Sequence, residues 1–133
     1  MNKRRALFWF CVTLVYTAGT FYLSSLKRFP KFIPTGFHFD WILHAIEYGI
    51  LGVLVMMTTH ALGWNSRAQS AWITVGFCGV VGGLNELFQK TIPNRSPSIG
   101  DEVANLIGVA LFLAGYFLIR RSYKPTTGST IAN

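Results

Sequence analysis

Four polar residues with helical spacing stand out around position 44. Asp40, His44 and Glu47 are separated by four and three residues, and Tyr48 follows Glu47 directly. At about 100° per residue, the first three project from a helix within about 60° of one another. A histidine beside two carboxylates has the residue types that general acid–base catalysis needs. This segment therefore predicts one chemically active helix face.

A second group of polar residues follows in the C-terminal half of the chain. Glu86 and Gln89 share a helix face at a spacing of three, and Asp101 and Asn105 share another at a spacing of four. Arg95 lies between the two pairs, and its planar guanidinium suits a phosphate or carboxylate ligand. We expect one polar site, formed by three helices and completed by Arg95.

The expected roles follow from the chemistry of these side chains. The predicted catalytic residues are His44, Glu47 and Glu86, with the histidine and Glu47 as the acid–base pair. The predicted ligand-binding residues are Arg95, Gln89, Asp101, Asn105, Asp40 and Tyr48. Together they describe a small site for an anionic head group at a membrane surface.

A metal site is an alternative use of the same residues. His44 and Glu47 stand at i, i+3, and Glu86 and Asp101 add carboxylate oxygens. One nitrogen with several oxygens suits a hard cation better than zinc. Only the spacing supports this alternative, so the sequence assigns neither a metal nor a cofactor.

Two further alternatives do not need a catalytic site. Polar residues between transmembrane helices often form only interhelical hydrogen bonds, worth about 0.6–2 kcal/mol each. Taken singly, His44, Gln89 and Asn105 fit that role, and Asp101 with Glu102 fits an N-terminal helix cap. A proton-coupled transporter is the other alternative, and four helices would then have to dimerise. The whole set on one side favours a ligand site, because intramembrane ionisable residues commonly mark function.

The elements that must position these residues are long apolar segments. Of the 133 residues, 13% are charged and 51% are hydrophobic, whereas a soluble domain has about 25% charged residues. Apolar runs cover residues 6–26, 41–62, 70–89 and 103–119. As helices, they are long enough to cross the hydrocarbon core of a bilayer, which is about 30 Å thick. The sequence predicts an all-α integral membrane bundle of four transmembrane helices and argues against a soluble enzyme.

The basic residues predict the orientation of the bundle. The net charge is +7, and the cations flank the apolar runs, which favours a membrane over nucleic acid as the partner. A basic N-terminus and four spans place both termini in the cytoplasm, and all five carboxylates then fall in the outer half of the membrane. We expect a single domain over residues 1–124, with a first helix that is retained and not cleaved as a signal peptide. Residues 125–133 are expected to form a polar, disordered tail.

Small residues predict where the helices approach closely. Gly76, Gly79, Gly82 and Gly83 put a small-residue face on the third apolar run, with Gly79-xxx-Gly83 as a GxxxG match. Ala45-xxx-Gly49 is a similar pair on the second run. Gly108 and Gly115 have no side chain, so another helix can pack closely against the fourth run at these two positions. These positions would draw the polar faces together, and the same motifs also suit a homodimer.

Two signatures in the chain resemble those of the VanZ-like family of membrane proteins. The first is Asp40-x-x-x-His44-x-x-x-Tyr48. The second is Glu86-x-x-Gln89, Pro93-x-Arg95, Ser98 and Asp101-x-x-x-Asn105-x-x-Gly108, and Phe21-Tyr-Leu-Ser-Ser25 fits as well. The resemblance runs from about residue 21 to residue 119, which is most of the chain.

The resemblance implies a role in the cell envelope. The VanZ-like family is named for a protein that lowers susceptibility to the glycopeptide teicoplanin, so a bacterial cytoplasmic membrane is the expected location. Together with the polar site, it implies a protein that binds or transforms an anionic, lipid-linked envelope intermediate. The alternative is a non-enzymatic scaffold or accessory subunit whose polar cluster only holds the helices together.

Overall fold

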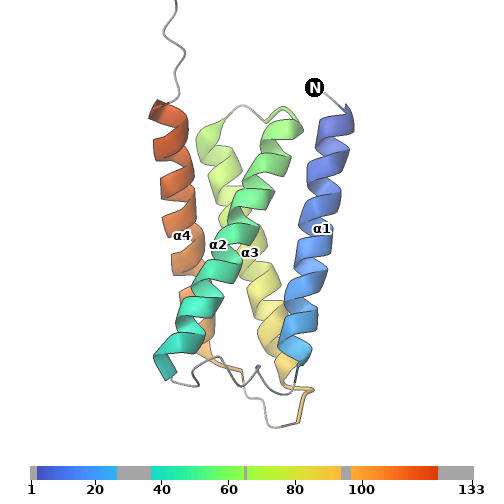
Figure 1. Ribbon diagram of the computed structural model, residues 1–133, viewed down its shortest axis with the longest axis vertical. Coiled ribbons are helices and arrows are strands. Elements are labelled where there is room, and N and C mark those ends of the chain that lie inside the picture. The colour runs from blue at the N-terminus through green and yellow to red at the C-terminus, as the bar shows by residue number, and fades with distance from the viewer. Residues whose placement is uncertain (1–2, 27–36, 65, 94–96, 123–133) are drawn as a thin grey trace, which may run out of the picture.

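Four long helices form an antiparallel bundle in the computed structural model (Figure 1). The structure describes residues 3–26, 37–64, 66–93 and 97–122. The helices are α1 (Lys3–Ser25), α2 (Phe37–Ala61), α3 (Arg67–Gln89) and α4 (Ile99–Ser122). All four are long and apolar enough to cross a membrane. Within these residues, the prediction of an all-α fold with four such helices is confirmed. The predicted tail over residues 125–133 lies outside the described residues.

Serine side chains cap the first turns of α3 and α4, and both helices begin before their apolar runs. The side chain of Ser66 caps α3 by accepting a hydrogen bond of 3.3 Å from the backbone N–H of Gln69. The side chain of Ser98 does the same for α4, at 3.3 Å from the backbone N–H of Asp101. Because such caps satisfy the free N–H groups of a first helical turn, these helices begin three or four residues before the predicted positions.

A tight turn after α2 returns the chain into α3. Gly63 has a φ of 85°, a conformation that costs glycine little and other residues more. Its N–H donates to the carbonyl of His60 at 3.1 Å, and the N–H of Trp64 donates to that of Thr59 at 3.2 Å. This pair of bonds is the Schellman pattern of a helix C-terminus, and it explains why α2 and α3 are antiparallel neighbours.

The most extensive helix contact is between α2 and α4. A Cβ atom added to Gly108 would meet the backbone of Ala45, and one added to Gly49 would lie about 2.5 Å from the ring of Phe112. The predicted close approach at Ala45, Gly49 and Gly108 is therefore present. Gly115 differs, because a Cβ atom there would have no neighbour within 4 Å.

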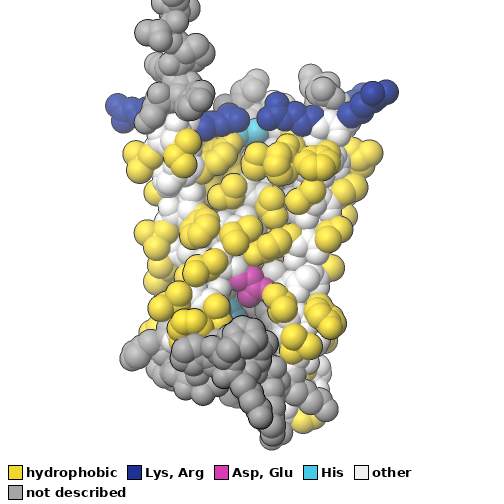
Figure 2. All heavy atoms as spheres, in the orientation of Figure 1, with side chains coloured by type: hydrophobic (Ala, Val, Ile, Leu, Met, Phe, Trp, Pro, Cys, Tyr) yellow, Lys and Arg dark blue, Asp and Glu magenta, His cyan; other side chains and the backbone are white. Residues whose placement is uncertain are grey.

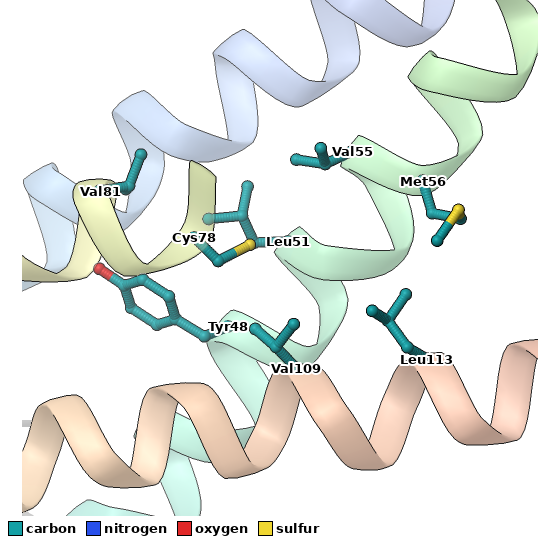
Figure 3. Close-up of a cluster of buried hydrophobic side chains, with 8 residues drawn as sticks. All are labelled: Tyr48, Leu51, Val55, Met56, Cys78, Val81, Val109 and Leu113. Carbon is teal, nitrogen blue, oxygen red and sulfur yellow. The ribbon is translucent and has the colours of Figure 1, made fainter. Parts of the chain in front are cut away.

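The apolar core lies between α2, α3 and α4 (Figure 3). Its buried residues are Tyr48, Leu51, Val55, Met56, Cys78, Val81, Val109 and Leu113. The outer faces of the bundle are also apolar: Val15, Trp72 and Leu111 are 74%, 76% and 65% exposed. Surfaces of this kind suit lipid, since a soluble monomer rarely exposes such extensive apolar patches.

The two ends of the bundle differ in charge. Among the described cations, Lys3, Arg4, Arg5, Arg67, Arg120 and Arg121 lie where α1 and α3 begin and α4 ends, and Lys90 lies at the other end. Figure 2 shows Lys and Arg side chains along one rim. The acidic residues Asp40, Glu47, Glu86, Asp101 and Glu102 all lie in the opposite half, because the helices alternate in direction. This half is called the acidic end below.

Candidate functional site

His44 on α2 lies at the centre of a polar cluster at the acidic end. Its Nδ1 atom is 3.1 Å from Oδ1 of Asn105 on α4. Its Nε2 atom is 3.7 Å from Oδ2 of Asp101, one turn earlier on α4. His44 is 9% exposed and Asn105 is fully buried. The histidine is thus fixed from one side and faces a carboxylate on the other.

Glu86 brings α3 into the same cluster. Its Oε2 atom accepts a hydrogen bond of 2.8 Å from the backbone N–H of Ser98, just before α4 begins. Its Oε1 atom accepts one of 3.3 Å from the side-chain amide of Gln89, one turn later on α3. Glu86 and Gln89 are both buried. These two donors orient the carboxylate and tie the end of α3 to the start of α4.

Three side chains from three helices therefore converge at one point. One ligand atom each from His44, Glu86 and Asp101 lies within 4.8 Å of the others. An imidazole and two carboxylates at this separation can share a proton, hold a cation or act as an acid–base pair. The cluster defined by His44, Glu86, Asp101, Asn105 and Gln89 is called the polar site below.

Glu102 also belongs to the polar site, although the sequence predicted only a helix cap for it. Its Oε2 atom accepts a hydrogen bond of 3.2 Å from Nδ2 of Asn105. Its carboxylate packs against Gly82 of α3, where an added Cβ atom would meet it directly. The signal in the sequence is the glycine, because a residue without a side chain leaves room for a carboxylate against the helix.

Other predicted site residues lie near the polar site without bonding to it. Glu47 is half-buried on α2, and no hydrogen bond or ion pair joins it to His44 within the described part of the chain. Its backbone carbonyl accepts a hydrogen bond of 3.0 Å from the hydroxyl of Tyr16 on α1. Its Oε1 atom is buried without a hydrogen-bond partner among the described residues. The structure thus pairs the histidine with Asp101, and not with Glu47 as the helical spacing predicted.

Tyr48 and Asp40 have different surroundings. Tyr48 is fully buried in the apolar core, with its ring directed from α2 towards α3 (Figure 3). Its hydroxyl has no hydrogen-bond partner among the described residues. Asp40 is half-buried in the first turn of α2, one turn before His44. Arg95, the predicted anion ligand, lies outside the described residues.

A second pair of polar residues joins α2 and α4 at the basic end. His60 on α2 has its Nδ1 atom 2.9 Å from the hydroxyl of Tyr116 on α4. The guanidinium of Arg120 lies 5.4 Å from the centre of the Tyr116 ring, a distance within reach of a cation–π contact. This histidine bonds the same two helices as His44 but has no carboxylate beside it in the described structure.

Comparison of the chain with protein-family models, curated proteins and solved structures gives no match. The geometry of the polar site and the two signatures in the sequence therefore carry the functional argument.

Proposed function

We propose that this chain is a VanZ-like, multi-pass protein of a bacterial cytoplasmic membrane that binds or transforms an anionic, lipid-linked envelope intermediate at the polar site. The observation that carries the proposal is the convergence of His44, Glu86 and Asp101 from three helices. Ionisable groups within membrane-spanning helices are costly, and they usually mark ligand or proton pathways. Six of the residues in the two family signatures lie in or beside this one site, which supports the resemblance.

The distribution of charge supports an orientation with the polar site in the outer leaflet. The basic rim formed by α1, α3 and the end of α4 matches the excess of cations on cytoplasmic segments. An envelope intermediate carried on a lipid would then reach the acidic end from the outer leaflet. This end is the one at which α2 and α4 begin and α3 finishes.

Cysteine labelling tests this orientation. Thr91 and Ser66 are exposed residues just beyond opposite ends of α3. In a variant without Cys11 and Cys78, a Thr91→Cys substitution should react with a membrane-impermeant maleimide added to intact cells. Ser66→Cys should react only after the membrane is opened. The opposite pattern would place the polar site in the cytoplasmic leaflet.

In this proposal Arg95, which lies outside the described residues, and the side chains of the polar site have different roles. Arg95 would hold a phosphate through its planar guanidinium. His44 with Asp101 would move a proton at the head group, as a histidine oriented by a hydrogen bond and facing a carboxylate can do. Glu86 and Asn105 would hold the reacting groups in place through their bonds to Ser98, Gln89 and Glu102.

Native mass spectrometry of gently solubilised protein tests the proposal. Wild-type protein should retain an anionic lipid, and Arg95→Ala should lose it, because the variant lacks the proposed phosphate ligand. Arg67→Ala is the control, since it removes one cation from the basic rim and should leave retention unchanged. Equal retention by Arg95→Ala and wild type would contradict this assignment.

A non-enzymatic scaffold is the second candidate function. Its support is that most polar atoms of the site bond to one another: Glu86 with Gln89, and Asn105 with both His44 and Glu102. Such bonds alone can hold transmembrane helices together. Under this alternative, substitutions in the polar site should lower thermal stability and abundance and should have no specific effect on a bound lipid.

A further inference from the structure

We propose that the polar site holds a divalent cation, with His44, Glu86 and Asp101 as its protein ligands. The cation would receive the phosphate of the anionic lipid. That second step rests on the proposed function, whereas binding of the cation itself can be tested without any lipid.

The charge of the acidic end is the first argument. Five carboxylates lie there in the described chain, namely those of Asp40, Glu47, Glu86, Asp101 and Glu102. Glu86 and Asp101 lie in one cluster, and two carboxylates so close repel each other unless a positive charge lies beside them. A divalent cation bound among them reverses the local charge and offers a phosphate oxygen a ligand position.

The hydrogen bonds of His44 are the second argument. Asn105 donates its Nδ2 hydrogen to the Glu102 carboxylate, which only accepts when ionised, so its Oδ1 atom is the one that faces the histidine. An amide oxygen can only accept, so Nδ1 of His44 carries the hydrogen. In a neutral imidazole, the lone pair is then on Nε2.

The direction of this lone pair points to a cation. Nε2 of His44 faces Oδ2 of Asp101 at 3.7 Å, a separation longer than a hydrogen bond. The residue is about nine-tenths buried, with an exposed fraction of 9%. With a neutral imidazole, two acceptor atoms are directed at each other, and a cation bound between them supplies the positive charge that a proton on Nε2 would otherwise supply. A metal-bound histidine typically has this arrangement, with its other ring nitrogen donating to an oriented acceptor.

The Glu86 carboxylate is also oriented by hydrogen bonds, as a metal ligand would be. Glu86 accepts from the backbone N–H of Ser98 and from the Gln89 amide, as metal-binding carboxylates usually do. The three ligand atoms lie within 4.8 Å of one another. A six-coordinate cation with bonds of about 2.1–2.2 Å accepts ligand atoms up to roughly 4.4 Å apart, so small side-chain rotations close the site.

The ligand set selects the kind of cation. One imidazole nitrogen and two carboxylates favour Mn²⁺ or a similar hard cation over zinc, whose structural sites are rich in cysteine and histidine. Three protein ligands leave positions for water or for phosphate oxygens. A cation so placed can polarise a phosphoryl group, and while it is bound His44 serves as its ligand and not as the group that moves a proton.

Titration of purified protein with Mn²⁺, followed by the loss of the free-ion electron paramagnetic resonance signal, tests the proposal. Wild-type protein in detergent should bind one Mn²⁺. Glu86→Gln and Asp101→Asn should each lower the affinity by more than the roughly 10–100-fold that loss of an outer-sphere partner costs. His60→Gln is the control, because it changes a histidine of the same helix far from the polar site. Wild-type protein that binds no Mn²⁺, or Glu86→Gln and Asp101→Asn variants that bind as wild type does, would overturn the proposal.

Adjacent glycines on α3 provide a test that leaves the three ligands in place. In Gly82→Ala the new Cβ atom occupies the position of the Glu102 carboxylate. The bond from Asn105 to Glu102 is then lost, and so is the orientation of His44. Mn²⁺ affinity should fall about 10–100-fold. Gly83→Ala adds a Cβ atom with no neighbour within 4 Å and should bind as wild type does, and equal affinity in the two variants would contradict the proposed role of Asn105.

The lipid experiment distinguishes failure of the cation site from failure of the proposed function. Mn²⁺ binding without a retained lipid would keep the cation site and reject the lipid ligand. A retained lipid without Mn²⁺ binding would reject the cation site and keep the proposed function.

Discussion

Replacing Gly108 by leucine is expected to prevent α2 and α4 from packing. A Cβ atom at this position would meet the backbone of Ala45, which cannot rotate away as a side chain can. Forcing side-chain atoms into a packed contact typically costs about 1–3 kcal/mol and sometimes more. Because this is the most extensive helix contact of the bundle, the variant should give little monodisperse protein in detergent and should unfold at a lower temperature.

The control for this substitution lies two turns later on the same helix. A Cβ atom at Gly115 would have no neighbour within 4 Å, so Gly115→Leu should elute and unfold as wild type does or be slightly more stable. The slight gain reflects the helix propensity of leucine, which exceeds that of glycine by nearly 1 kcal/mol. Equal stability of the two variants would mean that α2 and α4 do not cross at Gly108.

The helices were predictable because their signal is long and repeated. Each apolar run is at least 17 residues long and contains few charges. Its prediction as a membrane-spanning helix therefore does not depend on any single residue. The exact ends were less predictable, since they depend on capping contacts. The side chains of Ser66 and Ser98 cap the first turns of α3 and α4 by hydrogen bonds, and a hydropathy pattern contains no information about such bonds.

The polar site was predictable as a set of residues but not as a set of pairs. Helical spacing placed Glu47 beside His44, but this spacing describes only one helix. The partner of His44 is instead set by how α2 crosses α4, which brings Asp101 and Asn105 to the histidine. Pairings between helices depend on rotation and crossing angle, and a single sequence does not specify either.

The glycine pattern shows the same limit. The sequence predicts a small-residue face on α3 from Gly76, Gly79, Gly82 and Gly83. In the structure α4 approaches Gly79 and Gly82, in both cases through Glu102, whereas a Cβ atom at Gly76 or Gly83 would have no neighbour within 4 Å. A small residue permits a close contact without identifying its partner. The role of Glu102 therefore became clear only from the bundle geometry.

The second large effect is expected for His44→Gln. Glutamine keeps an amide that can donate to Asn105, but it removes the imidazole that faces Asp101. If the polar site binds a lipid head group, this variant should retain at least about tenfold less lipid, which corresponds to about 1.4 kcal/mol of binding free energy. Its melting temperature should stay close to that of wild type.

His60→Gln is a matched control for this variant. Both histidines lie on α2, and each bonds one side chain of α4, at 3.1 Å for His44 and at 2.9 Å for His60. If both bonds serve only to hold the helices together, the two substitutions should change stability by similar amounts, at most about 1 kcal/mol each, because glutamine can keep a bond to the partner side chain. Neither substitution should then change the amount of lipid that the protein retains.

The most direct measurement is therefore the amount of anionic lipid retained by wild type, His44→Gln and His60→Gln in native mass spectrometry, with the melting temperature measured on the same samples. A ligand site at the acidic end predicts that only His44→Gln loses the lipid and that its melting temperature is nearly unchanged. Equal lipid retention in all three proteins, with similar melting temperatures for the two variants, would contradict a ligand site and would assign the polar residues to helix packing.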